Sequence, residues 1–581
     1  MSDRTYYLGL CATYHDPALA IVDQNGAVLF AEATERFLQC KRALNAEPDH
    51  LSYLPEVLER YCELPAKFVV ALNWRRRRPW YENTVAALGI LRAEGLLRKG
   101  LRRLNLPLPN YKIHHMMACQ RYAIHRAGLN VPRLLEERFP GCRWRFVDFD
   151  HHLTHAAIGC FGSPFDEAVC AVVDSYGERG ALAHYHYRDG QLHLLHESRG
   201  MGSLGIYYMK LTELCGFDWL KGEEWKVMGL AAYGRRHEQA YRWLRAAIDV
   251  AGLDVRHDRT GLQSSLRHLE KIARKPGEPA EKAADLAFAG QEVFSEIMAE
   301  LLGNLHALGL SANLVLAGGC ALNSSFNGSI LDRTPFTRLY VPPAPADDGT
   351  ALGAAWLAWR WENRDAPVPA EMLSPYLGAS CAEFSLANLL RFARGLKILH
   401  RPDSIAEETA QLLAAGRLVG WFQGRAEFGP RALGNRSILA DPRDPGMKAR
   451  INACVKFREE YRPFAPSILP QYGREWFENY QESPYMERTL RFRPDYRKRV
   501  PAVVHVDGTG RVQTVEARWN PRFHRLIEQF HRLTRVPMVL NTSFNVMGKP
   551  IVHSVEDAVA VFLTTGLDAL AIGDYLLLKP D

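Results

Sequence analysis

Short apolar runs separated by polar turns open the chain, in the order expected for strands joined by a hairpin. Residues 7–10 are apolar, and two further apolar runs, 18–22 and 27–31, flank the sequence DQNG at 23–26. Asn-Gly tolerates positive φ and therefore favours a tight hairpin turn. Residues 51–64 follow with a helical pattern. The pattern predicts a strand, a hairpin and a helix, in that order.

The same order of elements returns later in the chain. Residues 168–173 form an apolar run that ends at Asp174, and the apolar runs 181–187 and 191–196 flank a turn of sequence RDG. A helical region at 207–215 comes next. A duplicated unit of this kind resembles the actin/hexokinase-type ATPase fold, in which two related α/β halves face a nucleotide cleft; the analogy is at the level of the fold.

A charged, proline-rich segment divides the chain. Before it, a buried run at 314–316 leads into Ala-Gly-Gly, with helical patterns at 283–307 and 350–361. The segment itself, ENRDAPVPAEMLSP, has no periodicity and is typical of a linker. The chain has 581 residues, too many for one ordinary core. We expect an N-terminal domain at 1–362, a linker at 363–378 and a second α/β domain at 379–581.

The composition is that of an ordinary globular protein. Hydrophobic residues make up 47% of the chain and charged residues 24%. No apolar stretch reaches the roughly 20 residues that span a bilayer, and the first residues lack the apolar core and cleavage site of a signal peptide. The 11 cysteines include no CxxC pair, so no disulfide framework is expected. These features predict a cytoplasmic location.

Two histidines four residues apart suggest a metal site. In the sequence HHLTH, a helix would place His151 and His155 on one face, as metal ligands require. Asp174 ends a predicted strand, and Asp347 comes just before a predicted helix. Two imidazoles and two carboxylates at the ends of elements suit iron, manganese or zinc. A surface helix would explain the histidine pair by itself, but the two acids favour the metal.

The sequence LAGGCALN follows a buried strand and is a candidate for phosphate binding. The backbone N–H groups at Gly318 and Gly319 can approach a phosphate closely, and the start of a following helix favours an anion. A plain tight turn explains the two glycines equally well.

Five motifs occur in a fixed order along the chain: HHLTH, VVDSYGE, KVMGLA, LAGGCALN and DDGTALGAA. This order resembles the NodU/CmcH-type carbamoyltransferase family, and the resemblance covers nearly the whole chain. The family's N-terminal domain is similar to the universal tRNA threonylcarbamoyltransferase, and its C-terminal domain is similar to YrdC-type proteins, which make carbamoyl-adenylates. The resemblance therefore implies a duplicated ASKHA (actin-like) ATPase-fold domain followed by a YrdC-like α/β domain.

The resemblance also implies an activity, that of an ATP-dependent O-carbamoyltransferase that uses carbamoyl phosphate. Carbamoyl-adenylate would form in the C-terminal domain, with release of pyrophosphate and phosphate. It would pass to the N-terminal cleft, where the hydroxyl of a natural product or glycan takes the carbamoyl group and AMP leaves. Mg²⁺ is expected on the ATP, and iron(II) or another divalent metal in the N-terminal site.

Basic and polar residues of the C-terminal half are expected to hold the phosphates and the carbamate. Arg431 lies in GRAEFGPRALGNRS, among apolar residues and glycines rather than other polar residues. Arginine suits bidentate phosphate contacts, and lysine acts as a point charge. A solvated basic surface is the alternative. The expected phosphate ligands, of which the first two are also expected to be catalytic, are Arg431, Lys456, Arg462 and Arg511; the expected carbamate ligands are Asn541 and Ser543.

In the N-terminal domain the resemblance assigns further roles. His15 matches the family's active-site histidine at the acceptor hydroxyl, and an imidazole suits a general base; a hydrogen-bonded pair with Asp16 is the alternative. Lys41 is expected to touch the adenylate, although Gln39 and Cys40 replace a more basic run there. Nucleotide contacts are expected from Gly318, Gly319 and Asn323, and a catalytic role from Asp174 within the metal set.

A basic segment is the main departure from smaller relatives. Between residues 75 and 103 nine basic and two acidic residues account for the whole net charge of +7. The pattern of residues 74–106 predicts one or two basic amphipathic helices. These helices either pack against the protein through their leucine face, or contact an anionic acceptor, a carrier-bound acceptor or a membrane surface. Charge is balanced in the rest of the chain, so no nucleic-acid partner is expected. The same balance argues against the alternative function of a tRNA threonylcarbamoylation enzyme. A non-catalytic nucleotide-binding scaffold is a third alternative. The oligomeric state stays open, a homodimer included.

Overall fold

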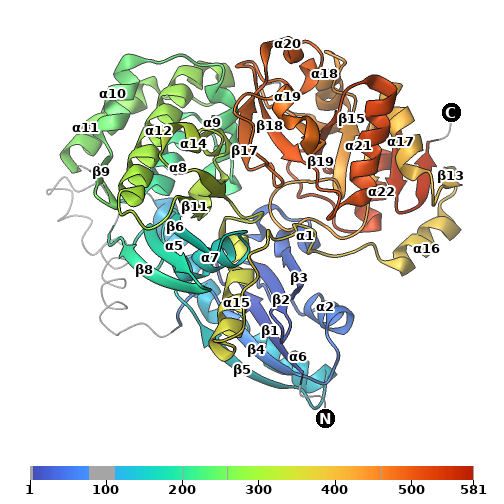
Figure 1. Cartoon of the computed structure of the whole chain (residues 1–581), viewed down its shortest axis with the longest axis horizontal. Coiled ribbons are helices and arrows are strands. Elements are labelled where there is room, and N and C mark those ends of the chain that lie inside the picture. The colour runs from blue at the N-terminus through green and yellow to red at the C-terminus, as the bar shows by residue number, and fades with distance from the viewer. Residues whose placement is uncertain (1–3, 77–110, 201, 258, 460, 580–581) are drawn as a thin grey trace.

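The computed structural model describes residues 4–76, 111–200, 202–257, 259–459 and 461–579. The basic segment predicted at 74–106 lies outside the described residues except for its first three. Three lobes are visible in Figure 1: the first half of the N-terminal domain at the bottom, its second half at the upper left, and the C-terminal domain at the upper right. The N-terminus lies at the bottom of this view and the C-terminus at the right.

Within the described residues, the first half contains a five-stranded sheet in the order β3-β2-β1-β4-β5. Strand β1 runs antiparallel to β2 and parallel to β4; β3 is antiparallel to β2, and β5 is parallel to β4. Gly26, with a φ of 86°, closes the hairpin between β2 and β3, as the Asn-Gly sequence predicts. The strands are β1 Thr5–Leu10, β2 Ala18–Val22, β3 Val28–Ala33, β4 Lys67–Leu72 and β5 Arg143–Asp148.

The second half repeats this topology. Its described strands lie in the order β8-β7-β6-β11-β12, with β6 antiparallel to β7 and parallel to β11. Strand β8 is antiparallel to β7 and β12 is parallel to β11, so every direction matches the first sheet. The predicted duplication and the α/β class are therefore confirmed. The strands are β6 Glu167–Val173, β7 Leu182–Arg188, β8 Gln191–Glu197, β11 Asn313–Ala317 and β12 Arg338–Tyr340.

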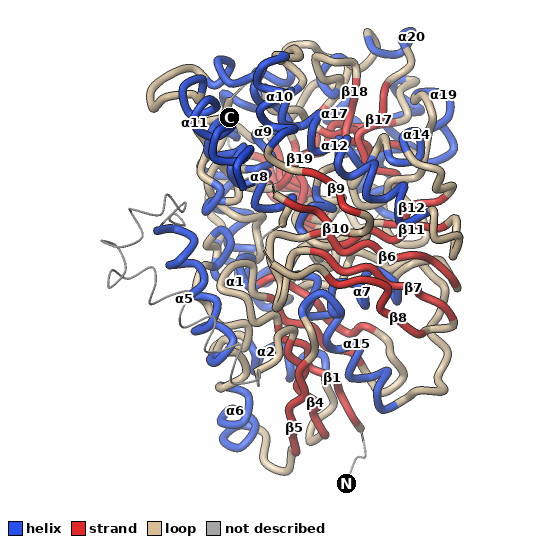
Figure 2. Tube along the Cα trace, turned by 90° about the vertical axis from the view of Figure 1, so that its left-hand side faces the viewer, coloured by secondary structure: helices blue, strands red, loops and turns tan. Residues whose placement is uncertain are grey.

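Two helices lie between the two sheets and bring the halves together (Figure 2). Helix α7, His151–Phe161, follows the first sheet but packs on β6 and β11; helix α15, Thr350–Glu362, follows the second sheet but packs on β1 and β2. The two helices also pack on each other, which requires a glycine. A Cβ at Gly353 would lie 2.0 Å from the carbonyl oxygen of Thr154, so any larger residue would force the helices apart.

The other helices of the N-terminal domain cover its sheets, and α2, α8 and α12 lie on the helical patterns predicted at 51–64, 207–215 and 283–307. Helix α2 begins at Leu54 with Pro55 at its first turn, and α8 begins at Leu204 because the Ser203 side chain caps it. The remaining elements are α1 Thr34–Leu38, η1 Lys41–Ala43, α2 Leu54–Tyr61, α5 Tyr111–Arg126, α6 Asn130–Arg138, α8 Leu204–Leu214, η3 Trp219–Lys221, α9 Glu224–Ala231, α10 Glu238–Ala246, β9 Asp249–Ala251, β10 Asp254–Arg256, α11 Arg259–Ile272, η4 Ala280–Ala283, α12 Ala284–His306, η5 Gly319–Leu322, α13 Ser324–Asn327, α14 Ile330–Arg333 and η6 Asp347–Gly349.

The C-terminal domain is built on a nine-stranded mixed sheet in its described part, in the order β13-β21-β20-β14-β15-β19-β16-β18-β17. Its core contains Trp421, Phe422, Phe523 and Leu540. The elements are α16 Glu383–Phe392, β13 Lys397–His400, α17 Ile405–Ala414, β14 Val419–Phe422, β15 Arg436–Ala440, α18 Met447–Ile451, η7 Asn452–Lys456, β16 Ala465–Ile468, η8 Pro470–Tyr472, α19 Gly473–Trp476, β17 Arg488–Arg491, α20 Pro494–Arg497, η9 Pro501–Val503, β18 Thr509–Thr514, α21 Pro521–Thr534, β19 Met538–Ser543, α22 Val555–Thr564, β20 Ala569–Ile572 and β21 Tyr575–Leu578.

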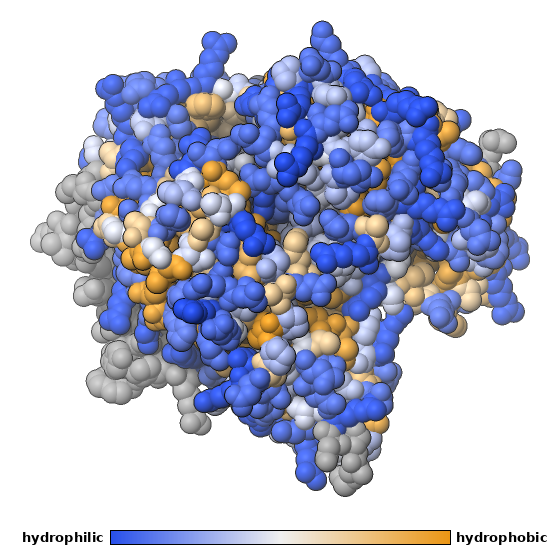
Figure 3. Space-filling view, viewed as in Figure 1, coloured by the Kyte–Doolittle hydropathy of each residue, from blue (hydrophilic) through white to orange (hydrophobic). Residues whose placement is uncertain are grey.

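No helix or strand occurs between Glu362 and Glu383, the stretch in which we propose the linker at 363–378. Polar contacts nevertheless join the two domains. Buried Glu32 accepts hydrogen bonds from Ala379 N at 3.0 Å and from Tyr53, and it lies 3.2 Å from His553. The face shown in Figure 3 is mainly hydrophilic, with scattered apolar side chains. No helix in the described part of the chain is long and apolar enough to cross a membrane.

Candidate active site at the meeting of the two domains

The four predicted metal ligands lie together in the N-terminal domain. His151 and His155 point from the first turns of α7, Asp174 follows β6, and Asp347 begins the turn before α15. One donor atom from each of the four lies within 4.8 Å of the others, and all four side chains are buried. His151 Nε2 is 3.4 Å from Asp174 Oδ2, and His155 Nε2 is 3.4 Å from Asp347 Oδ1. The structure thus brings the set together, as the spacing and the strand ends predict.

The donor chemistry of these residues fits a divalent cation. His155 donates from Nδ1 to the carbonyl oxygen of Pro345 at 3.1 Å, which leaves the lone pair of Nε2 facing the carboxylates, with no hydrogen-bond partner in the described part of the chain. Burial opposes charge on His151, but hydrogen bonds to the Asp174 and Asp347 carboxylates outweigh burial and raise the pKa of His151 to about 10. Two buried carboxylates require positive charge at this point, which a metal ion would supply.

His15 lies beside His151, His155, Asp174 and Asp347, which we call the metal set. Its Nδ1 is 3.5 Å from Asp347 Oδ2 and 2.9 Å from Asp16 Oδ2. The loop that carries it, between β1 and β2, is held by Gln120 of α5, whose side-chain amide donates to Ala12 O and accepts from Tyr14 N, both at 3.0 Å. Sequence reasoning missed Gln120, because nothing in the pattern relates residues so far apart.

The Gly-Gly turn contacts one of the predicted metal ligands. Gly319 N donates to Asp174 Oδ1 at 3.1 Å, and Gly318 has a φ of 89°. The predicted helix start is here a 3₁₀ turn, η5, followed by the short helix α13. Asn323 caps α13 through Phe326 N and exchanges hydrogen bonds with Gln291. Nucleotide contacts from these residues remain a prediction.

The predicted C-terminal residues also converge. Arg431 lies in the loop before β15, Lys456 ends the π-helix η7, and Arg511 lies on β18, two strands from β19, which carries Asn541 and Ser543. Arg431 and Arg458 are the charged neighbours of Arg511, and Arg458, Arg462 and Lys41 are those of Lys456. We call Arg431, Lys456, Arg458, Arg462 and Arg511 the cation cluster.

The cation cluster has too few acids to balance its charge. Among the described residues one carboxylate, that of Glu459, forms an ion pair with a member of the cluster, namely Arg462. Burial lowers the pKa of Arg431 to about 10, and burial together with Arg462 lowers that of Arg458 to about 9. The pKa of Lys456 lies well below its usual range, through burial and then its cationic neighbours. Buried and half-buried cations with so few acids around them favour an anionic ligand such as a phosphate.

Asn541 and Lys456 have defined partners in this cluster. Asn541 Nδ2 donates to Ala432 O, Ser467 Oγ and Gln513 Oε1, at 3.0 to 3.2 Å. Its Oδ1 is buried and has no hydrogen-bond partner in the described part of the chain. Lys456 Nζ donates to Ser543 Oγ at 3.2 Å and to Asn545 Oδ1 at 2.7 Å. One hydrogen-bond acceptor, Asn541 Oδ1, is therefore left for a ligand.

Charged residues connect the two candidate sites. From the metal set, His15 and Asp16 lead to Arg42, whose Nη2 is 2.9 Å from Asp16 Oδ2. Lys41 precedes Arg42 in the chain, and its pKa is lowered by burial and by Arg462, although Glu35 opposes this. The structure thus places Lys41 beside the cation cluster rather than beside the metal set.

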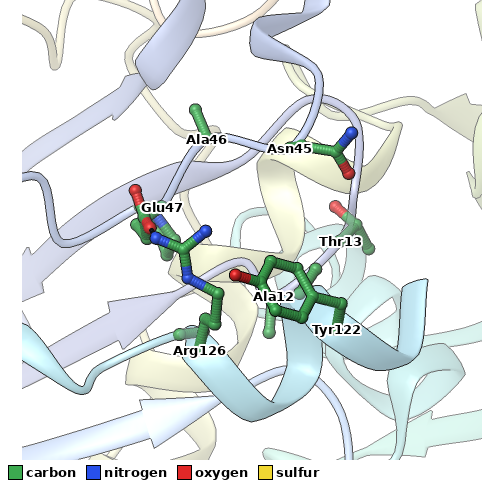
Figure 4. Close-up of a pocket in the computed structure, with 10 residues that line it drawn as sticks. Ala12, Thr13, Asn45, Ala46, Glu47, Tyr122 and Arg126 are labelled. Atoms are coloured by element: carbon green, nitrogen blue, oxygen red, sulfur yellow. Dashed lines mark ion pairs between the residues drawn. The ribbon is translucent and has the colours of Figure 1, made fainter. Parts of the chain in front are cut away.

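Two hollows lie outside these sites. The hollow in Figure 4 is enclosed by the start of the β1–β2 loop, residues 45–48 and α5, and contains the ion pair between Arg126 and Glu47. Its volume of about 10 Å³ would take at most a single water molecule. A larger hollow of about 640 Å³ lies between β12 and the 470–488 region, and none of the predicted site residues line it.

Comparisons with known proteins identify the family. The family model described as "Carbamoyltransferase N-terminus" matches residues 142–356, and that described as "Carbamoyltransferase C-terminus" matches residues 410–579. Nodulation protein NolO of Bradyrhizobium diazoefficiens is 38% identical over 74% of this chain and 79% of its own length. The chain belongs to the carbamoyltransferase family.

Other relatives of this carbamoyltransferase differ in sequence identity and in the share of their length that aligns with this chain. An uncharacterised protein of Synechocystis is 32% identical over 99% of this chain and 97% of its own length. The 3'-hydroxymethylcephem-O-carbamoyltransferase of Amycolatopsis lactamdurans is 28% identical over 77% of this chain and 84% of its own length. Among solved structures, full-length HypF is 12% identical with a TM-score of 0.35, covering 62% of this chain and 56% of that chain. A TM-score this low has no bearing on function.

Two residues of this carbamoyltransferase escaped the sequence reasoning although a signal was present. Arg458 lies two positions after Lys456, so the run KFR already carried the second cation. Trp225 precedes the motif KVMGLA, and its ring lies 3.7 Å from the Arg462 guanidinium carbon. Trp225 could not be assigned from the sequence, because its contact with Arg462 crosses the domain boundary.

Proposed function

We propose that this carbamoyltransferase works by two half-reactions, of which the first consumes ATP. In the first, carbamoyl phosphate, ATP and one water yield carbamoyl-adenylate, pyrophosphate and phosphate. In the second, the oxygen of an acceptor hydroxyl attacks the carbamoyl carbon, the bond to AMP breaks, and AMP leaves while the hydroxyl proton is removed. The convergence of the five-residue cation cluster beside the unpartnered Asn541 Oδ1 carries this proposal.

The first half-reaction belongs to the cation cluster. Arg431, Arg458 and Arg511 hold the phosphates and balance charge as it moves from the triphosphate to the leaving pyrophosphate. Carbamoyl differs from other acyl groups by its NH₂, which donates two hydrogen bonds. Asn541 Oδ1 is a buried acceptor of the kind that such a group requires, and Ser543 lies beside Lys456.

The second half-reaction belongs to the metal set and His15. A divalent metal ion, iron(II) being our proposal, would supply Lewis-acid polarisation there, held by His151, His155, Asp174 and Asp347. His15 accepts the proton of the acceptor hydroxyl, and the Asp16 carboxylate stabilises the positive charge that forms on the imidazole. Lys41 and Arg42 lie between the two sites and attract the anionic adenylate on its way.

The acceptor is proposed to be a hydroxyl of a small natural product or glycan. The named relatives support this class: one is named for O-carbamoylation of a hydroxymethylcephem, and another is a nodulation protein. The basic segment 74–106 remains the candidate for contact with the acceptor, a carrier or a membrane.

Separable variants test the division into half-reactions. His15→Asn should abolish carbamoylation of any accepted hydroxyl yet leave acceptor-independent ATP–pyrophosphate exchange, measured with carbamoyl phosphate present, at the wild-type rate. Arg431→Ala should abolish both activities. If His15→Asn also loses the exchange, the proposed division of labour is wrong.

A further inference from the structure

A short segment of the C-terminal domain is anchored in the N-terminal domain. Residues 457–459 and 461–463, which we call the tongue, follow η7 and begin with Phe457 in the left-handed region, at a φ of 48°. Tyr461 of the tongue is 2% exposed and belongs, like Val227 and Leu230 of α9, to the apolar core of the second N-terminal half. The tongue therefore carries two members of the cation cluster, Arg458 and Arg462, on a support that comes from the other domain.

Helix α9 contacts the tongue at three points. The Arg462 guanidinium stacks on the ring of Trp225, with its carbon 3.7 Å from the ring centre. Lys226 Nζ lies 3.2 Å from Glu459 Oε1 and 2.7 Å from Glu223 Oε1. A Cβ at Gly229 would lie 3.6 Å from Pro463, so the backbones lie close there. These residues belong to the EEWKVMGLA sequence, whose function the two half-reactions leave unassigned.

The charges explain why such a support is needed. Arg458 and Arg462 lie near Lys456 and Lys41, and like charges repel, so the cations would separate without an anchor. Within the described residues, Arg462 has one acidic partner, Glu459, and Lys226 holds that acid in turn. Stacking on Trp225 leaves the edge of the guanidinium available for hydrogen bonds. Its Nη1 donates to Glu459, and its Nε has no hydrogen-bond partner among the described residues.

We infer that Trp225 and Lys226 of the N-terminal domain are positioning residues for the phosphate-binding site of the C-terminal domain. The first half-reaction then depends on both domains, and adenylate forms only where the tongue is docked against α9. This inference rests on the proposed function, since it assigns the cation cluster to the phosphates of that reaction.

Full-length variants test this inference by acceptor-independent ATP–pyrophosphate exchange. Trp225→Leu should lower kcat/KM for ATP by about 3- to 30-fold, the range expected for a desolvated guanidinium–aromatic contact. Trp225→Phe keeps an aromatic face and should restore most of the rate. Matched controls in the same domain are Trp361→Leu, an exposed tryptophan of α15, and Lys210→Met, a surface lysine paired with Glu213; both should match the wild type.

A double-mutant cycle covers the case in which Trp225→Leu does not fold. Lys226→Met and Glu459→Gln should each lower the exchange rate, and the double variant should lose less than the product of the two effects, since both remove one contact. Thermal unfolding of each variant shows whether the fold is kept. Folded Trp225→Leu with wild-type exchange, or strictly multiplicative losses in the cycle, would overturn the inference. A wild-type chain without any exchange would instead reject the proposed function.

Discussion

Removal of one arginine from the cation cluster should stabilise the free protein while weakening its ligand binding. Arg511 on β18 has no acidic partner in the described residues, and burial, Arg431 and Arg458 hold its pKa well below its usual range. For a half-buried group such as Arg511, each like-charged neighbour costs about 1 kcal/mol. Arg511→Met keeps the apolar stem and removes the charge. After some loss of packing, we expect a net gain of about 1 kcal/mol, or about 2–4 °C for a domain of this size.

The effect should reverse when an anion is present. Pyrophosphate at about one hundred times its dissociation constant should stabilise the wild-type chain by about 2.7 kcal/mol. Loss of a charged hydrogen-bond donor worth about 1.5–3 kcal/mol weakens binding by roughly 10- to 100-fold. At the same pyrophosphate concentration the stabilisation of Arg511→Met should then fall to about 0.4–1.4 kcal/mol.

Differential scanning calorimetry with and without pyrophosphate measures both effects and separates the transitions of the two domains. Arg532→Met, at an exposed position of α21 outside the cluster, controls for the substitution itself. The reasoning is refuted if Arg511→Met melts below the wild type without ligand, or if it keeps the full pyrophosphate shift.

Three further predictions concern the rest of the chain. His155→Ala should lower the bound metal, counted by elemental mass spectrometry, by about tenfold and leave the pyrophosphate shift intact; equal metal in both proteins would exclude the site. Gly318→Ala should destabilise the chain by about 2 kcal/mol, because φ is 89° and the new Cβ would lie 2.4 Å from a carbonyl oxygen, whereas Gly303→Ala, in open space on α12, should not destabilise it. Burial opposes charge on His553, but Glu32 raises its pKa, so the stabilisation that its charge provides is complete below about pH 6.5 and lost as the pH rises through the raised value. The free energy of unfolding of His553→Gln, measured in urea, should therefore approach that of the wild type at high pH. A constant difference between the two from pH 6 to pH 9 would contradict this.

The sequence by itself determined the local structure and the duplication. Alternating apolar runs, with Asn-Gly and Asp-Gly turns between them, predicted both hairpins, because turn geometry and strand periodicity depend on neighbouring residues. The spacing of His151 and His155 predicted a shared helix face for the same reason. Asp174 could be placed as well, since it ends a buried strand. The family resemblance, carried by motifs in order, supplied the carbamoyl chemistry, which no local pattern contains.

Only the tertiary structure decided which distant groups meet. Asp347 was already expected among the metal ligands, but the exchange of α7 and α15 between the sheets, which brings it to histidines nearly 200 residues away along the chain, was not. The Gly319 N–H, expected for a phosphate, is taken by Asp174 because β6 and β11 are adjacent strands. Arg458 joins the cluster, and Lys41 reaches it from the other domain. Such partners depend on packing, because charge–charge contacts act over a few ångströms in space and leave no periodic pattern in the sequence.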